Sequence, residues 1–149
     1  MKLYFDTSAL VKFFHVEEGT PVVSGLVEDG ENQIYISELA KIEFHCALYR
    51  RCRNGELESQ KLEQALDGFN NQIDAFNIER LGSAVVDEAE KLLQLYGRHH
   101  GLRTLDALHL ATFSLISERN WHFVSTDSGL NKVANKMGFE VINPLGSND

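Results

Sequence analysis

Short apolar runs alternate with longer stretches of helical periodicity along the chain. Short runs rich in β-branched and aromatic residues predict strands. They cover residues 3–5, 34–36, 121–126 and 139–142, with a weaker one at 76–81. Between them, apolar residues recur three or four positions apart, which predicts amphipathic helices. The predicted helices cover residues 8–14, 21–28, 38–53, 56–75, 83–96, 104–116 and 128–137.

This alternation of strands and helices predicts an α/β fold with a central, mainly parallel sheet of four to five strands and helices on both faces. The first run, residues 3–5, is apolar on both faces, as expected for a strand that helices cover on both sides. In such sheets, ligands collect in the crevice at the carboxyl ends of the strands. Polar residues that directly follow a strand are therefore the first candidates for a functional site.

Two aspartates stand at such strand ends. Asp6 follows the first strand, and Thr7 or Ser8 is the predicted cap of the helix that follows; Thr20 is the predicted cap of the second helix, with proline next in the chain. Asp127 ends the fourth strand in the same way as Asp6 ends the first. In a parallel sheet both carboxylates open on the same edge, although each could also serve only as a helix cap.

Two further acids sit on predicted helices. Glu43 lies four residues after Leu39, on or beside the apolar face of helix 38–53, where an uncompensated charge is unfavourable. A snorkelling side chain or a buried salt bridge is the alternative explanation. Apart from His109, Asp106 is the only ionisable residue in the apolar helix 104–116. Its place in the first turn favours the negative charge, and capping alone could account for it.

Composition limits the class of protein. With 149 residues, 43% of them hydrophobic, we expect one globular domain, residues 1–149, ending in a polar tail at 143–149. No apolar run approaches a membrane span, and no leader pattern stands at the N-terminus, so we expect a cytoplasmic protein without a membrane partner. Cys46 and Cys52 fit free thiols in a reducing compartment.

The formal net charge of −8 argues against a nonspecific nucleic-acid binder, unless the acids gather at a metal site. Like charges about 4 Å apart repel by roughly 4 kcal/mol per pair at an effective dielectric near 20. Four converging carboxylates would therefore take up protons or bind hard cations such as Mg²⁺ or Mn²⁺. Such ions activate water and stabilise the leaving oxygen in phosphodiester hydrolysis. Loose candidates for phosphate contacts are Lys12, Arg50, Arg98 and Arg103, the last two in a predicted glycine-bounded loop at 97–103.

Four segments, in order, resemble the PIN domain family, and most of all its VapC-type toxin ribonucleases. They are residues 4–12 (YFDTSALVK), 37–43 (SELAKIE), 104–111 (TLDALHLA) and 124–127 (VSTD). The resemblance implies a three-layer α/β/α, Rossmann-like sandwich and a metal-dependent endoribonuclease that leaves a 5′-phosphate and a 3′-hydroxyl. By segment, the acidic quartet is Asp6, Glu43, Asp106 and Asp127, with Asp6 and Asp106 as principal metal ligands and the other two bound directly or through water.

The resemblance also implies that Ser8 and Thr126 are the hydroxyls that accompany the first and last acids. It further implies a homodimer and a cognate VapB-like antitoxin that occludes the cleft. The chain departs from many relatives after the last acid, where Ser128 and Gly129 replace a basic residue.

Three other functions are weighed against an RNA-cleaving toxin. A catalytically silent PIN-like module that binds RNA or protein is the main alternative, although the intact set of four acids argues against it. A phosphotransferase with Asp6 as nucleophile usually has a second acid two residues later, where this chain has Ser8. A dinucleotide-binding domain would need a Gly-x-Gly-x-x-Gly motif after the first strand, which is absent from the sequence.

Overall fold

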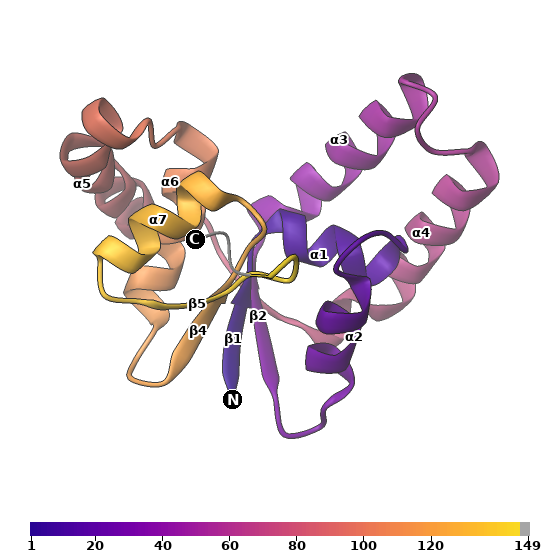
Figure 1. The fold of residues 1–149 in the computed structure, drawn as a ribbon, viewed down its shortest axis with the longest axis horizontal. Coiled ribbons are helices and arrows are strands. Elements are labelled where there is room, and N and C mark those ends of the chain that lie inside the picture. Colours follow the sequence, from indigo (N-terminus) through magenta and orange to yellow (C-terminus); the bar gives the residue numbers. More distant parts are fainter. Residues whose placement is uncertain (147–149) are drawn as a thin grey trace.

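The computed structural model describes residues 1–146, shown as a ribbon in Figure 1. Five strands alternate with seven α-helices and one short 3₁₀ helix over these residues. In chain order they are β1 (Lys2–Phe5), α1 (Thr7–Phe14), α2 (Thr20–Glu28), β2 (Gln33–Ser37), α3 (Leu39–Arg53), α4 (Ser59–Gln72), η1 (Ile73–Ala75), β3 (Asn77–Glu79), α5 (Ser83–His100), α6 (Thr104–Ile116), β4 (Trp121–Val124), α7 (Ser128–Lys136) and β5 (Glu140–Ile142).

The strands form one sheet in the order β3-β2-β1-β4-β5, and every neighbouring pair is parallel. The predicted α/β fold with a parallel sheet of four to five strands is therefore confirmed. β1 is the central strand: Leu3 pairs with Ile34 of β2 on one side and with His122 of β4 on the other. Because all strands run the same way, their carboxyl ends lie along one edge, and the loops after β1 and β4 are neighbours there.

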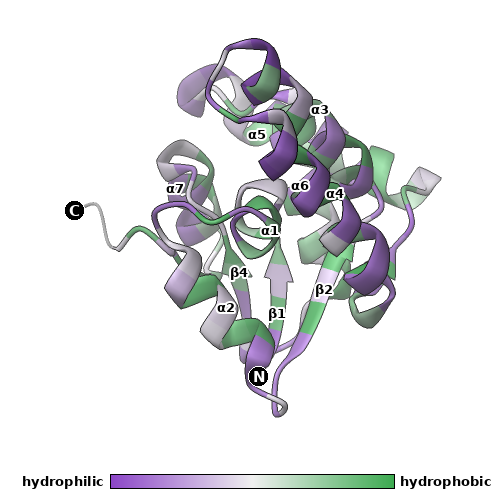
Figure 2. Ribbon diagram, turned by 90° about the vertical axis from the view of Figure 1, so that its right-hand side faces the viewer, coloured by the Kyte–Doolittle hydropathy of each residue, from purple (hydrophilic) through white to green (hydrophobic). Residues whose placement is uncertain are grey.

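Helices cover both faces of the sheet and define two cores. Leu3 and Phe5 belong to a core shared with α1–α4, whereas Tyr4 points to the opposite face and packs among α5, α6 and α7. In Figure 1 the two groups of helices diverge above the carboxyl ends of the strands like the arms of a V. Figure 2 shows hydrophilic residues on the outer faces of the helices. The acidic strand ends therefore lie at the base of the V.

Helix α5 is longer than predicted. It continues through Gly97 to His100, so the predicted loop at 97–103 is wrong for its first four residues. Gly97 has ordinary helical conformation, and only Gly101, with φ of 65°, adopts the left-handed conformation that ends the helix. Arg98 and the two histidines after it stand in the last turn, where the helix dipole favours positive charge. Of the two glycines that could have ended the helix, Gly97 continues it and Gly101 ends it.

Two predicted helix caps, Thr7 or Ser8 for α1 and Thr20 for α2, are wrong by one or two residues, and the alternative that Asp6 caps α1 is confirmed. Asp6 itself caps α1, with its carboxylate accepting a hydrogen bond from the Ala9 N–H at 3.1 Å, so neither Thr7 nor Ser8 has that role. The cap of α2 is Gly19, with φ of 92°, and Thr20 is the first helical residue. A carboxylate accepts more strongly than a hydroxyl, which explains the preference for Asp6 at the first of these positions.

Part of the predicted polar tail packs on the domain. Residues 147–149 of the predicted polar tail lie outside the described residues. Before them, Pro144 is buried and the Gly146 N–H donates to the Asn143 carbonyl at 2.9 Å, so this part of the tail packs on the domain. None of the helices in residues 1–146 is long and apolar enough to cross a membrane. Cys46 and Cys52 are free thiols, as predicted.

Candidate active site

Asp6 lies at the carboxyl end of the central strand and is almost completely buried, with 5% of its surface exposed. Its two oxygens accept from hydroxyls on both sides: Ser8 Oγ donates to Oδ1 at 2.6 Å and Ser125 Oγ to Oδ2 at 2.5 Å. Burial raises the pKa of Asp6 above its ordinary value, against the smaller opposing effects of the His109 charge and these hydroxyls. Hydrogen bonds thus hold the Asp6 carboxylate in place, while its negative charge is only partly compensated.

Ser125 is a site residue that the sequence reasoning missed. Its buried hydroxyl also accepts from the Asp127 N–H at 3.0 Å, and its carbonyl accepts from Asn131 Nδ2 at 2.8 Å. Thr126, the predicted supporting hydroxyl, takes part through its backbone instead: its N–H donates to Ser8 Oγ at 3.1 Å. Both residues lie in the loop after β4, and only the Ser125 hydroxyl points toward Asp6. The sequence does not say which of two adjacent hydroxyls in a loop will do so.

Asp106 and Asp127 face each other across a small cavity. Asp127 caps α7 by accepting from the Leu130 N–H at 3.0 Å, and Asp106 stands in the first turn of α6. Both line a cavity of about 160 Å³ together with Arg103 and His100. Burial, then the negative charges of Asp127 and Asp6, raise the pKa of Asp106. These three acids from distant parts of the chain therefore share one electrostatic environment.

Glu43 belongs to a neighbouring hydrogen-bond network. Its Oε1 accepts from Thr7 Oγ1 at 2.7 Å and lies 2.5 Å from His109 Nε2. His109 in turn lies 2.8 Å from the Tyr4 hydroxyl through Nδ1. Burial alone would raise the pKa of Glu43, but the hydrogen bonds and charge of His109 and the Thr7 hydroxyl lower it. Glu43 is thus half-buried and hydrogen-bonded to His109, an environment close to the predicted alternative of a buried salt bridge, and sequence reasoning passed over His109.

Asp6, Asp106 and Asp127 influence one another electrostatically, and Glu43 is hydrogen-bonded to His109, whose charge acts on Asp6 and Asp106. Within residues 1–146, no three His, Cys, Asp or Glu side chains have the spacing of a metal site. The donor set consists of carboxylate and hydroxyl oxygens, the ligand type that Mg²⁺ and Mn²⁺ prefer. The raised pKa values of Asp6 and Asp106 show where a cation would offset unfavourable negative charge. The chemistry of the site therefore fits a hard divalent cation that is drawn in between the carboxylates.

The basic candidates have different positions. Lys12 is buried and paired with Glu17 at 2.9 Å, and Arg51 pairs with the same glutamate at 2.7 Å. This ion-paired lysine ties α1 to the loop after it and is not presented at the surface, contrary to its candidacy for phosphate contact. Arg50 and Arg98 are exposed.

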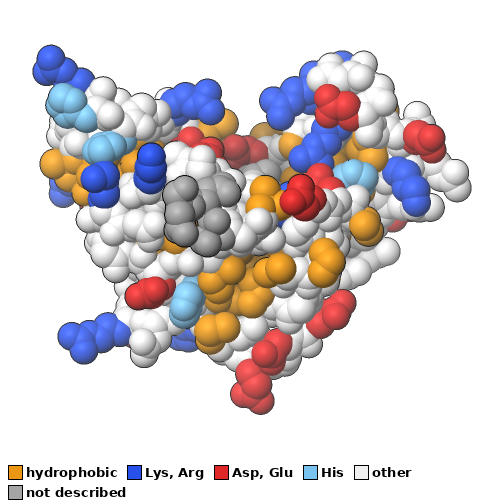
Figure 3. Space-filling model, viewed as in Figure 1, with side chains coloured by type: hydrophobic (Ala, Val, Ile, Leu, Met, Phe, Trp, Pro, Cys, Tyr) orange, Lys and Arg blue, Asp and Glu red, His pale blue; other side chains and the backbone are white. Residues whose placement is uncertain are grey.

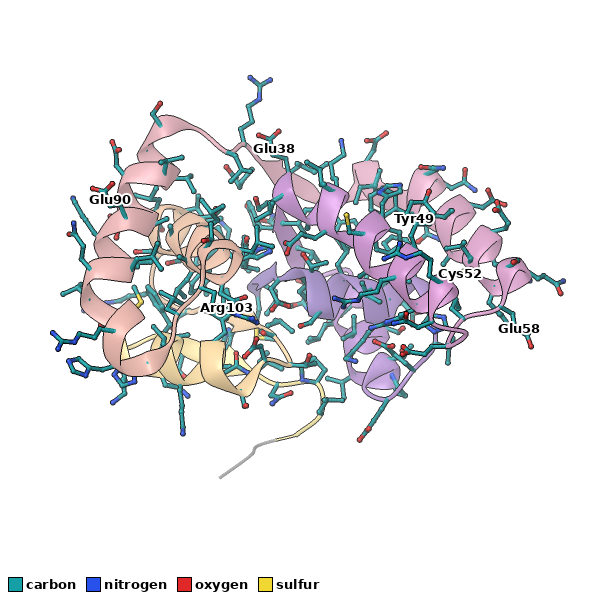
Figure 4. The ribbon with its side chains drawn as sticks, turned by 90° about the horizontal axis from the view of Figure 1, so that it is seen from above. Glu38, Tyr49, Cys52, Glu58, Glu90 and Arg103 are labelled. Carbon is teal, nitrogen blue, oxygen red and sulfur yellow. The ribbon has the colours of Figure 1, made fainter. Side chains whose placement is uncertain are left out.

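Arg103 is also exposed and lines the cavity of Asp106 and Asp127. In the view of Figure 4 it lies between the two groups of helices. Figure 3 shows a notch between the same groups, with acidic side chains on its floor and Lys or Arg side chains on both rims. An extended polyanion in this notch would meet basic side chains on either side.

The chain is thus a three-layer α/β/α domain with acids at the carboxyl edge of a parallel sheet. The sequence model of the PIN domain matches residues 3–136. Two ribonucleases of Mycobacterium tuberculosis, VapC45 (strain CDC 1551 / Oshkosh) and VapC49 (strain ATCC 25618 / H37Rv), are each 31% identical over 139 residues, 93% of this chain and 93% of theirs. The chain belongs to the PIN domain family, as its motifs predicted.

Solved structures show the same fold. A chain of FitAcB from Neisseria gonorrhoeae superposes with a TM-score of 0.66 at 18% identity, over 97% of this chain and 99% of that chain. A chain of DNA-bound VapBC from Salmonella typhimurium gives a TM-score of 0.66 at 12% identity, over 97% and 98%. VapBC2 from Rickettsia felis, bound to a fragment of its promoter, gives 0.63 at 16% identity, over 96% and 98%.

Proposed function

We propose that this protein is a metal-dependent endoribonuclease and the toxin of a type II toxin–antitoxin pair. The observation that carries the proposal is the gathering of Asp6, Asp106 and Asp127 at the carboxyl edge of the sheet. Burial raises the pKa of Asp6, and burial together with the charges of Asp127 and Asp6 raises that of Asp106. Its relatives of 31% identity are ribonucleases by name, which supports RNA as the substrate. Its structural neighbours include chains of VapBC complexes, which supports a VapB-like partner.

The roles follow from the positions of the acids. Asp6 and Asp106 are the proposed principal ligands of Mg²⁺ or Mn²⁺, and Glu43 and Asp127 complete the set directly or through water. When bound, the cation activates water and neutralises charge on the phosphate oxygens. Ser125 and Ser8 hold the Asp6 carboxylate so that it keeps one orientation. A bound cation would take the place of the protons that the raised pKa values of Asp6 and Asp106 favour. Cleavage then leaves a 5′-phosphate and a 3′-hydroxyl.

The acidic net charge does not conflict with an RNA substrate. The −8 charge is spread over the whole chain, whereas Arg103 lies at the cavity of the acids and Arg50 and Arg98 are exposed on helices of opposite arms. We propose these three arginines as phosphate contacts and leave Lys12 out, because its ammonium group is buried and paired with Glu17. Phosphate contacts of this kind position the substrate without reading its sequence.

We propose that residues 1–149 act as one domain, since the sheet and both cores extend over nearly the whole chain. A homodimer and an antitoxin that covers the notch are proposed from the family. We place the protein in the cytoplasm, where a ribonuclease toxin would meet cellular RNA and where Cys46 and Cys52 would stay reduced.

Cleavage assays on the purified full chain test the chemistry. We expect structured RNAs to be cut with Mn²⁺ or Mg²⁺ and to stay intact in excess chelator. Asp6→Asn and Asp106→Asn should each abolish cleavage. Asp67→Asn, on the exposed face of α4, is the matched control and should cleave like the wild type. Wild-type cleavage by Asp6→Asn would refute the assignment.

A catalytically silent module is the second candidate, favoured by the absence of a preformed three-ligand metal group within residues 1–146. The two candidates differ in one measurement. A silent module would bind RNA fully in excess chelator and release no product when Mn²⁺ is restored. A nuclease would cleave the same bound RNA after the metal is added.

A further inference from the structure

His109 and Asp106 are the two ionisable side chains of α6, and only 2% of His109 is exposed. Polar groups buried to this extent are held by hydrogen bonds. Both ring nitrogens have a partner: Nδ1 lies 2.8 Å from the Tyr4 hydroxyl, and Nε2 lies 2.5 Å from Glu43 Oε1. The imidazole of α6 therefore bridges the central strand, through Tyr4, and helix α3, through Glu43.

The protons in this bridge can be assigned. The Tyr4 phenol carries one hydrogen, and its oxygen lies 2.8 Å from His109 Nδ1, within hydrogen-bond distance. An ionised carboxylate can only accept, and Glu43 Oε1 already accepts from Thr7 Oγ1 at 2.7 Å. Nε2 must then carry a hydrogen that it donates to Glu43. The orientation of the His109 ring is thereby fixed.

The second donor to Glu43 adds a constraint. Thr7 Oγ1 donates to the same Oε1 at 2.7 Å and lies 3.3 Å from His109 Nε2. Among residues 1–146, no hydrogen bond is found on the other oxygen of Glu43. Two donors thus hold the carboxylate by one oxygen and leave the other free for a ligand.

We propose that His109 is a positioning residue for Glu43, which it orients across the gap between α3 and α6 so that one carboxylate oxygen stays available to the metal and its water. Side chains that hydrogen-bond to a metal-ligating residue fix the orientation of that residue. Their loss typically lowers metal affinity or activity about 10–100-fold. The kinetic consequence rests on the proposed nuclease function, whereas the hydrogen bond and its effect on metal affinity can be measured without RNA.

The hydrogen bond itself is tested by NMR on protein with ¹⁵N-labelled histidine. An Nε2–H that donates to a carboxylate should give a proton resonance shifted far downfield. In Glu43→Gln, where the acceptor is neutral, this resonance should move upfield. A His109 Nε2–H resonance that is unchanged by Glu43→Gln would overturn the proposed contact.

The positioning role is tested by Mn²⁺ titration and by kinetics. His109→Leu should weaken Mn²⁺ binding and lower kcat, each about 10–100-fold, with the KM for RNA within about twofold of the wild type. His109→Gln, which can still donate to Glu43, should recover most of both losses. Equal losses in His109→Gln and His109→Leu would mean that the ring only fills space, and wild-type Mn²⁺ affinity in His109→Leu would refute the role.

One variant serves as a control and another as a second test. His122→Leu replaces a half-buried histidine of β4 that lies outside this network, and it should behave like the wild type. Tyr4→Phe removes the support from the other side of the ring and should cause a smaller loss in the same direction, which keeps the proposal testable if His109→Leu fails to fold. If the wild type cuts no RNA, the proposed function fails, while the NMR and Mn²⁺ measurements still decide the role of His109.

Discussion

Ser125 Oγ lies 2.5 Å from Asp6 Oδ2, although the two residues are 119 positions apart in the chain. The same hydroxyl accepts from the Asp127 N–H at 3.0 Å. One buried side chain therefore couples the loop after the central strand to the loop after β4. The relative position of the first and last acids of the site depends on it.

We expect Ser125→Ala to reduce cleavage about tenfold or more, because Asp6 loses one of its two hydroxyl donors in a buried setting. A hydrogen bond to a charged group is worth about 1.5–3 kcal/mol, so the free energy of unfolding should also change measurably in urea. Thr126→Val is the matched control. Its hydroxyl makes no hydrogen bond within the described residues, and it should retain near-wild-type activity; a greater loss in Thr126→Val than in Ser125→Ala would contradict this assignment.

Asp6→Asn should abolish activity and stabilise the metal-free protein at neutral pH. The buried carboxylate is the source of the unfavourable charge, and asparagine keeps the helix-capping oxygen. A gain of about 1 kcal/mol corresponds to roughly 2–4 °C in Tm for a domain near this size. Thermal unfolding in chelator measures the shift, and a Tm below that of the wild type would show that the hydrogen bonds of the carboxylate outweigh its charge.

The stability of the metal-free protein should depend on pH in two windows. Burial raises the pKa of Asp6 and, with Asp127 and Asp6 as neighbours, that of Asp106, so folding favours their protonated forms. The free energy of unfolding should therefore fall as pH rises through these raised values, above the ordinary aspartate range near about 4. Glu43 has the opposite sign: its lowered pKa gives stability that is lost only at more acidic pH.

Urea unfolding in chelator from pH 3 to 8 measures both windows, with maximal stability expected at mildly acidic pH. Mn²⁺ should raise the Tm most at neutral pH, where the acids are ionised and bind it best. A metal-free protein whose stability rises steadily from pH 5 to 8 would contradict the raised pKa values.

Arg103 and Lys12 should respond differently to substitution. Arg103→Ala should weaken RNA binding and reduce its salt dependence by about one phosphate contact, with little effect on folding. Lys12→Met keeps the buried stem but breaks the pair with Glu17, so it should lower the free energy of unfolding by about 2 kcal/mol and leave RNA affinity nearly unchanged. Fluorescence titration with RNA at several salt concentrations, in the Asp6→Asn background, separates the two effects. A loss of RNA affinity in Lys12→Met would show that Lys12 does contact phosphate.

Much of the fold could be predicted from the sequence because its signals are local. The strand around Leu3, the breaks after Asp6 and Asp127, and the apolar period of α6 each depend on neighbouring residues in the chain. The alternation of strands and helices predicts a parallel sheet, because strand–helix–strand units join parallel strands by right-handed crossovers. The error at Gly97 shows the limit of local signals, because a glycine permits a break without requiring one.

The sequence by itself determined which acids stand at strand ends and helix starts, and so which four were candidates for the site. Only the tertiary structure decided which side chains hold them, because those contacts join residues about a hundred positions apart, as in Tyr4 with His109 and Asp6 with Ser125. Whether a buried hydroxyl or imidazole faces a carboxylate depends on strand pleat and helix rotation in the packed core. Periodicity shows that such a residue is inside but does not identify its partner.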